Sequence, residues 1–186
     1  MGQEEADLIR RWKQGEPAAF EALVRRWQQP VARFLFRLIG QAEQVQDLCQ
    51  EVFLRAYLAT SRYRETGAFS TWLYRIALNV ARDTGRRRRH EPGPLPGTDL
   101  ADGTASKADE LCQQKELAAA VGQAVAALPD SLREVLVLRH YEGLSFESMG
   151  RLLHMPASTL KSRFTAALQR LKQHLSNLGW SDEELP

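Results

Sequence analysis

Polar side chains that could bind DNA are concentrated near the C-terminal end of the chain. A short helix from Ser145, a turn at 154–156 and a longer helix over about 157–175 form the pattern of a helix-turn-helix. Apolar residues at helical spacing predict the inner face of the longer helix, and they are Leu160, Phe164, Leu168 and Leu171. The polar residues of its first half then face outward, and they are Ser158, Thr159, Lys161, Ser162 and Thr165, with Arg163 at the flank. Lysine can donate to guanine and hydroxyls can contact base edges or phosphates, so the pattern favours DNA binding over an ordinary packing helix.

A second set of candidate nucleic-acid contacts lies on a helix expected from about Ser70. Its outward residues are Arg75, Asn79, Arg82 and Arg86, and arginine continues through residues 86–89. Arginine binds phosphate or guanine in a bidentate manner, and asparagine can read adenine. In the preceding loop, an exposed Tyr63 ring could stack on an unpaired nucleotide. Two alternatives remain open, namely a Tyr63 ring folded over the core and an arginine cluster that is only a solvated helix end favoured by the helix dipole.

An acidic surface is expected on the helix over about 42–60. Opposite its apolar side lie Glu43, Asp47, Gln50, Glu51 and Leu54, which share one face at helical spacing. Such a face is either solvated or a docking surface for a basic partner. The leucine among the acids favours docking.

The elements that carry these residues are almost all helical. Nearly every periodic stretch fits a 3.6-residue repeat, which predicts an all-α fold of two small helical domains. The first domain is expected over 1–90 and the second over 109–176. Proline, glycine and aspartate dominate 91–108, which predicts a flexible linker, and 177–186 is a short acidic tail.

Composition excludes several other classes of protein. The net charge of +2 hides separate basic and acidic clusters, which suits a protein that binds DNA and a second, less basic partner. No apolar run could span a bilayer and no signal-peptide core is present, so a cytoplasmic protein is expected. The two cysteines and four histidines show no metal-ligand spacing. With no phosphate loop, no nucleophile beside a base and no paired carboxylates, neither an enzyme nor a cofactor is expected.

Several segments resemble the extracytoplasmic-function (ECF) sigma factors. Residues 47–53, DLCQEVF, resemble the family's DLxQExF signature, and 69–79, FSTWLYRIALN, resemble its FxxWLxxIAxN segment. Residues 128–135 and 142–146 resemble the start of its second domain, and 159–164, TLKSRF, resemble its TVKSR recognition helix. The matches follow the family's order and cover nearly all the chain outside the linker and tails.

The resemblance implies roles that spacing alone does not supply. The first domain would bind the clamp of core RNA polymerase and the melted −10 element, and the second would bind the −35 duplex and the polymerase flap. Asp47, Gln50, Glu51 and Leu54 would then dock on the clamp. Tyr63 and Asn79 would lie near the pocket for a flipped base, with Arg75, Arg82 and Arg86 as further −10 contacts. The six polar residues over 158–165 would contact the −35 element, and an anti-sigma factor is a further expected partner.

Some positions depart from the family pattern. Met149-Gly150 replaces the usual Ile-Ala, Ala157-Ser158 replaces an acid and glycine, and Ala166 stands where arginine is common. These departures bear on the −35 preference rather than on the fold. The alternative function is a helix-turn-helix regulator that acts without polymerase, which would need neither the acidic face nor the Tyr63 loop.

Overall fold

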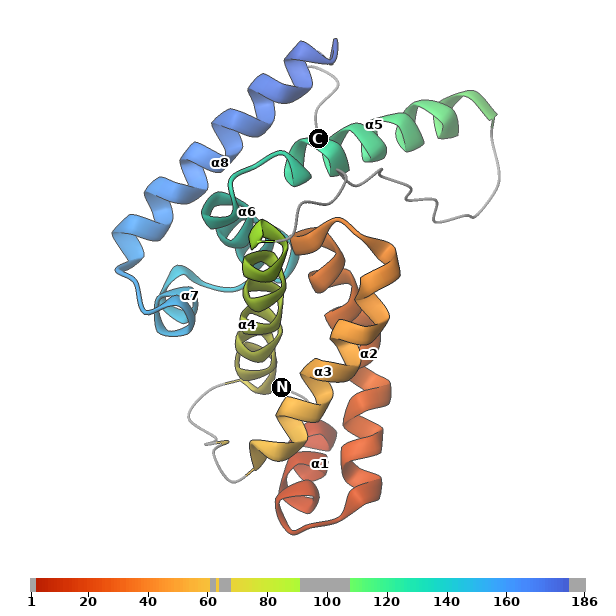
Figure 1. Ribbon diagram of the computed structural model, residues 1–186, viewed down its shortest axis with the longest axis vertical. Helices are drawn as coiled ribbons and strands as arrows, with labels where there is room; N and C mark the ends of the chain where they lie inside the picture. Colours follow the sequence, from red (N-terminus) through yellow and green to blue (C-terminus); the bar gives the residue numbers. More distant parts are fainter. Residues whose placement is uncertain (1–2, 61–62, 64–67, 91–107, 181–186) are drawn as a thin grey trace. The chain divides into compact units, whose positions relative to one another are not determined.

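The regular structure of the described residues is entirely helical, as the sequence predicts. This computed structural model describes residues 3–60, 63, 68–90 and 108–180, apart from the side chains of 88–90 and 108–115 (Figure 1). The chain divides into two compact units, Met1–Leu95 and Pro96–Pro186. The predicted linker lies outside the described residues except for Ala108, with which the second unit's first helix begins.

Unit 1 consists of four helices, α1 (Gln3–Lys13), α2 (Pro17–Ile39), α3 (Ala42–Leu58) and α4 (Phe69–His90). Proline suits the first turn of a helix because its missing N–H would have no partner there, and Pro17 occupies that position in α2. Helix α2 continues through Pro30. It ends at Gly40, whose φ of 72° is readily adopted by glycine and whose N–H bonds the Phe36 carbonyl at 2.7 Å.

The core of unit 1 is formed where α2 packs against the other three helices. Its fully buried side chains include Ile9, Leu23, Phe34, Leu35, Val52, Leu73 and Leu78. One polar contact fixes α1 on α2: the Trp27 indole donates a 2.8 Å hydrogen bond to the carboxylate of Glu5. Glu5 is only 5% exposed, so this bond, with Arg26 at 3.7 Å, supplies partners to a buried acid.

Unit 2 consists of α5 (Ala108–Ala126), α6 (Asp130–Leu136), a π-helical turn η2 (Val137–Tyr141), α7 (Phe146–Leu153) and α8 (Ala157–Asn177). Helical periodicity from Asp130 to Gly143 would fit a single α-helix. Instead the hydrogen bonding widens after α6, with Glu142 N–H bonded to the Val137 carbonyl at 3.2 Å. Helical periodicity does not distinguish such a turn from an α-helix.

The turn between α7 and α8 has a tightly closed backbone. Ser145 caps α7 by accepting a 3.1 Å hydrogen bond from Ser148 N–H, as predicted. At the other end His154 adopts a left-handed φ of 56°, and Met155 N–H bonds the Gly150 carbonyl at 3.1 Å. A Cβ on Gly150 would lie 2.9 Å from the Met155 carbonyl oxygen, so the glycine allows this close approach.

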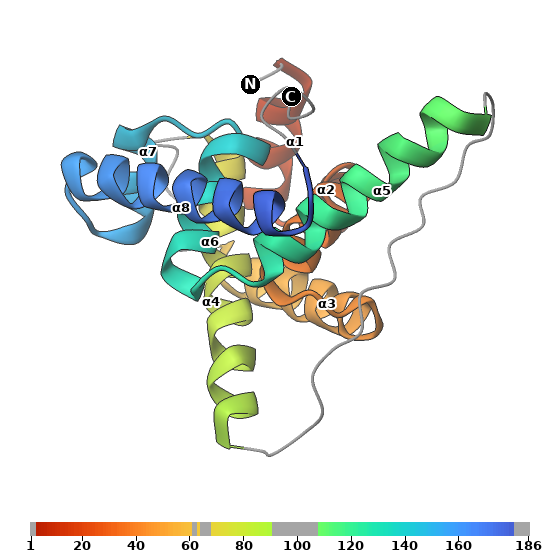
Figure 2. The ribbon, with the colours of Figure 1, turned by 90° about the horizontal axis from the view of Figure 1, so that it is seen from above.

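The inner face of α8 differs from the predicted one. Leu160, Ala167 and Leu175 are buried, Phe164 and Leu171 are half-buried, and Leu168 is 42% exposed. The first part of α8 packs against α7 and its later part packs against α5 (Figure 2). One straight stripe of large side chains therefore cannot pack against both helices. The small Ala167 allows close approach, whereas Leu168 lies about 100° farther round the helix.

The residues after α8 continue its packing. Trp180 packs with Leu171 and Val121 on the cluster of Ala120, Ala124 and Leu175. The predicted tail over 177–186 therefore contributes to unit 2 as far as Trp180, and 181–186 lie outside the described residues.

Candidate nucleic-acid and partner interfaces

The predicted acidic face of α3 is exposed and carries more apolar surface than expected. Asp47 and Gln50 are exposed, and Leu54 is 55% exposed. One turn farther along α3, Leu58 is 72% exposed. It continues the spacing of residues 47, 50 and 54, but the sequence analysis did not predict it as part of this face. Tyr57, also exposed, rests its ring 5.2 Å from that of Phe20. Exposed leucines flanked by acids on one helix are suited to bind a partner that is both apolar and basic.

Glu51 lies at the edge of this face and binds within the unit. It accepts a 2.6 Å hydrogen bond from Arg55, which also donates to Asp83 of α4 at 3.1 Å. Asp83 accepts a further bond from Arg86. The hydrogen bond with Glu51 and, to a smaller extent, the one with Asp83 raise the pKa of Arg55 above its ordinary value. The guanidinium groups of Arg86 and then Arg55 hold the pKa of Asp83 below its ordinary value.

The predicted polar stripe of α4 lies at the surface of unit 1. Asn79, Arg82 and Arg86 are exposed and Arg75 is half-buried. Because α4 is one continuous helix, residues at this spacing share a face. Arg87 is exposed beside them, while the side chains of Arg88 and Arg89 lie outside the described residues.

Tyr63 does not lie where the stacking interpretation requires. Its ring is 2% exposed and packs against Trp72 at 5.0 Å, Phe69 at 5.7 Å and Trp12 at 6.3 Å. The prediction of an exposed ring is therefore wrong, and the alternative of a ring folded over the core is correct. Contacts with aromatic residues of α1 and α4 bury more of the apolar surface of the Tyr63 ring than contacts with the polar loop residues would.

The polar residues at the start of α8 project from unit 2 as predicted. Ser158, Lys161, Ser162 and Thr165 are exposed, and Thr159 is half-buried. The Ser162 hydroxyl donates to the Ser158 carbonyl at 2.8 Å, and the Thr165 hydroxyl donates to the Lys161 carbonyl at 3.2 Å. With their protons used inside the helix, both hydroxyl oxygens present acceptors to the outside.

The two basic residues in the first half of this helix contact neighbouring side chains. The Lys161 ammonium lies 5.9 Å from the centre of the Phe146 ring, which also carries the Arg139 guanidinium at 5.0 Å. Half-buried Arg163 donates to the Met155 sulfur at 3.3 Å and so contacts the turn before α8. Lys161 is thus directed toward the start of α7, and Arg163 supports the turn.

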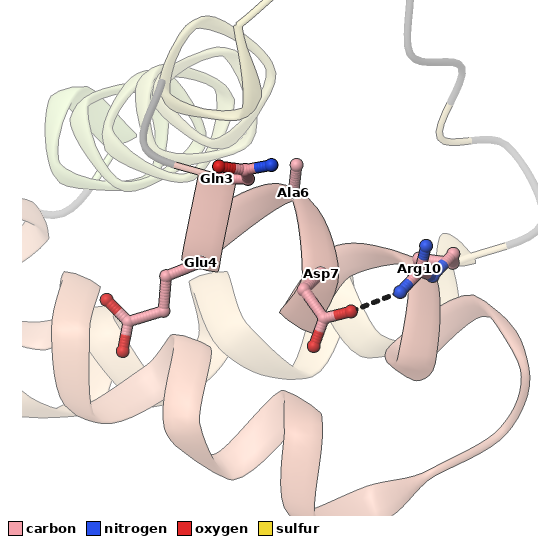
Figure 3. Close-up of a pocket in the computed structure, with 5 residues that line it drawn as sticks. All are labelled: Gln3, Glu4, Ala6, Asp7 and Arg10. Carbon is pink, nitrogen blue, oxygen red and sulfur yellow. Dashed lines mark hydrogen bonds and ion pairs between the residues drawn. The ribbon is translucent and has the colours of Figure 1, made fainter.

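The other candidate features of the described residues do not form a reactive site. The outer face of α1 is hollowed beside Gln3, Glu4, Ala6, Asp7 and Arg10, where Arg10 pairs with Asp7 (Figure 3). Burial raises the pKa of the Cys49 thiol to about 11, so it is protonated at neutral pH. No group of metal-ligating side chains and no helix long and apolar enough to cross a membrane occurs in the described part of the chain.

Comparison with known proteins identifies the family of this chain. Sigma-70 region 2 matches residues 23–91, and Sigma-70 region 4 matches residues 118–171. The RNA polymerase sigma-H factor of Pseudomonas aeruginosa is 31% identical over 95% of this chain and 96% of its own. The ECF RNA polymerase sigma-E factor of Escherichia coli is 32% identical over 92% of this chain and 94% of its own. The chain belongs to the ECF RNA polymerase sigma factors.

The fold of this sigma factor agrees with a solved relative. The structure of the sigma factor RpoE in complex with the anti-sigma factor NepR from Bartonella quintana has a TM-score of 0.72 and 19% identity. The likeness covers 84% of this chain and 96% of that one. The region 2 match includes α3 and α4, and the region 4 match includes α7 and the polar start of α8. Helix α1 precedes the region 2 match, although it packs on α2.

Proposed function

We propose that this sigma factor binds core RNA polymerase and directs it to a class of promoters. In this proposal residues 1–90 form the polymerase- and −10-binding domain, 109–176 form the −35-binding domain, and the linker 91–108 joins them. Residues 177–186 form a short acidic tail. The polymerase performs the chemistry, so the chain needs no catalytic group or cofactor of its own and acts in the cytoplasm, where it meets polymerase.

The α3 face is the observation that carries the proposal. Asp47 and Gln50 lie beside Leu54, whose exposure would be costly without a partner. We assign Asp47, Gln50, Leu54 and the accessible part of Glu51 to the clamp of the polymerase. A regulator acting without polymerase would have no use for this face.

The basic surfaces supply the DNA contacts. Arg75, Asn79, Arg82 and Arg86 of α4 bind the −10 element, where arginine neutralises phosphate and asparagine reads a base. Ser158, Thr159, Lys161, Ser162, Arg163 and Thr165 of α8 face the −35 major groove. Unit 2 also contacts the polymerase flap. Because the solved relative of this fold is bound to an anti-sigma factor, we further propose such a partner for this chain.

Titration of core polymerase with the full chain tests the α3 assignment. Asp47→Arg should weaken binding tenfold or more, because it places a cation against a basic partner. Glu21→Arg makes the same charge change at an exposed position on α2 and should leave binding unchanged. Equal affinities for both variants would reject the clamp assignment. Failure of the wild-type chain to bind polymerase would favour the regulator alternative.

Transcription in vitro on a promoter library then tests the wider proposal. Core polymerase with this chain should initiate at a restricted set of sequences that core polymerase alone does not use. An unchanged set of start sites would contradict it.

A further inference from the structure

The turn between α7 and α8 contains a methionine to which the proposed function assigns no role. Two methionines lie among the described residues. Met149 of α7 is fully buried, at 0% exposure, whereas Met155 of the turn is half-buried. Peroxides oxidise a thioether to a sulfoxide, and a side chain that solvent reaches reacts before one enclosed in the core. An oxidant is therefore expected to act on Met155 before Met149.

The sulfur of Met155 contacts one of the proposed phosphate-binding groups. The Arg163 guanidinium of α8 donates a hydrogen bond to this sulfur at 3.3 Å. A thioether is a weak acceptor, so this contact competes poorly with a DNA phosphate for the guanidinium. A stronger acceptor at the position of the sulfur would compete better.

The backbone at Met155 is fixed independently of its side chain. Its N–H bonds the Gly150 carbonyl at 3.1 Å, and His154 before it adopts a left-handed φ of 56°. Its carbonyl oxygen lies so close to Gly150 that a Cβ there would approach it to 2.9 Å. A chemical change at the sulfur therefore acts on the Met155 side chain and on Arg163, because the main chain of the turn is already closed on α7.

We propose that Met155 is a site of reversible oxidation that controls DNA binding through Arg163. The inference rests on the proposed DNA-binding function of α8. Hydrogen peroxide transfers one oxygen atom to a lone pair of the sulfur. The S–O bond forms, the O–O bond breaks and the rest of the peroxide leaves as water, so the sulfur loses two electrons and the peroxide gains them. A methionine sulfoxide reductase, which draws its electrons from thiols, restores the thioether.

The sulfoxide oxygen is a strong hydrogen-bond acceptor beside a guanidinium. The methionine side chain has three rotatable bonds, so the new oxygen turns toward the Arg163 group that the sulfur already contacts. A hydrogen bond from a charged donor to this oxygen is stronger than one to a thioether, and Arg163 is withdrawn from phosphate. Oxidation therefore lowers the affinity for DNA of any sequence, because phosphate contacts carry no sequence information.

Titration of the full chain into a fluorescently labelled DNA duplex of mixed sequence, before and after hydrogen peroxide, tests the proposal. Dithiothreitol follows the peroxide, because it reverses oxidation of cysteines to disulfides or sulfenic acids but leaves a methionine sulfoxide. Peptide mass spectrometry should find the added oxygen at Met155 and not at Met149. The oxidised chain should bind roughly tenfold more weakly, with a slope of binding against salt reduced by about one unit. Methionine sulfoxide reductase should restore both.

Variants at the two methionines and at Arg163 assign the effect. Met155→Leu has no sulfur to oxidise, so its affinity should be the same before and after peroxide. Met149→Leu is the matched control and should lose affinity on oxidation as the wild-type chain does. Met155→Gln places a strong neutral acceptor beside Arg163 and should bind as weakly as the oxidised chain without any oxidant. Peroxide should not change the affinity of Arg163→Ala, which already lacks the phosphate contact.

The outcomes separate this inference from simpler explanations. A loss of affinity that persists in Met155→Leu, or oxidation of Met149 as fast as Met155, would overturn the assignment of the site. An equal loss in Arg163→Ala would overturn the role of Arg163. Circular dichroism of the oxidised chain should match that of the untreated chain, and a loss of helix would mean that oxidation unfolds the turn instead.

Binding of the duplex by the untreated chain is measured in the same experiment. Failure there overturns the DNA-binding assignment itself. Normal binding that oxidation of Met155 leaves unchanged overturns only the present inference.

Discussion

The side chain of Arg133 on α6 donates a 2.7 Å hydrogen bond to the main-chain carbonyl of Leu128, just beyond the end of α5. The same guanidinium donates to the carbonyls of Ala126 at 2.6 Å and Val125 at 3.2 Å. The last carbonyls of a helix have no partner within it, so Arg133 caps α5 from the next helix. Burial lowers the pKa of Arg133, although an arginine remains charged at any physiological pH.

Loss of this cap should destabilise unit 2. Arg133→Met keeps the aliphatic length but leaves three carbonyls without their charged donor, which should lower the free energy of unfolding by about 2–3 kcal/mol. Urea unfolding followed by circular dichroism measures the change. Arg170→Met, at an exposed position of α8, is the control. Equal stabilities of the two variants would contradict the capping role.

The burial of Tyr63 predicts a loss of stability on truncation. Tyr63→Ala removes a ring that contacts Trp12, Phe69 and Trp72. The free energy of unfolding of unit 1 should therefore fall by about 3–5 kcal/mol. Tyr63→Phe keeps the ring and its aromatic contacts and should change the free energy of unfolding by less than about 1 kcal/mol. Thermal unfolding by circular dichroism compares them. A Tyr63→Ala chain as stable as Tyr63→Phe would mean that the ring leaves the core in solution.

The α7–α8 turn predicts an unusual effect of alanine at Gly150. Alanine is ordinarily favoured over glycine in a helix by about 1 kcal/mol. Here the new Cβ would meet the Met155 carbonyl oxygen at 2.9 Å, so Gly150→Ala should destabilise unit 2 by about 1–2 kcal/mol. Gly85→Ala in α4 of unit 1 provides the comparison, because a Cβ at that helical position would meet nothing within 4 Å. If Gly150→Ala were the more stabilising change, the turn would be looser than described.

The start of α8 predicts different effects for two DNA contacts. Lys161→Ala should cost about 1–3 kcal/mol on the preferred −35 duplex and little on a scrambled one. Arg163→Ala should weaken both duplexes, through a lost phosphate contact and a less well supported turn at Met155. Binding of the full chain to matched and scrambled duplexes across salt concentrations distinguishes them. A uniform loss for Lys161→Ala would assign its ammonium to phosphate, in keeping with its direction toward α7.

Local signals predicted the helices and several of their ends. Ser145 begins α7 as predicted because a cap depends on a few neighbouring residues. The exposed residues of α3 and the α4 stripe also follow from helical spacing alone. Such spacing identifies the residues of a surface, but it gives no information on what they contact.

Contacts between distant segments could not be predicted in this way. The position of the Tyr63 ring depends on Trp12, far away in sequence, and the bond from Arg55 to Asp83 joins two helices. On α8, the buried residue is the small Ala167 rather than the large Leu168, because close helix packing decides the face. Hydrophobicity favours the leucine, and only the neighbouring helices determine the outcome.

The division of α8 into buried and exposed positions has an evolutionary consequence. Its anchor is Leu160, Ala167 and Leu175, while Ser158, Lys161 and Ser162 project away from the packing. Substitutions at exposed positions usually change stability by no more than about 0.5 kcal/mol. Duplicated copies of such a gene can therefore diverge in the sequence they recognise through single, individually tolerated changes. Ala167 is the position that cannot change in this way, because a larger side chain there would force α8 away from the helices that pack against it.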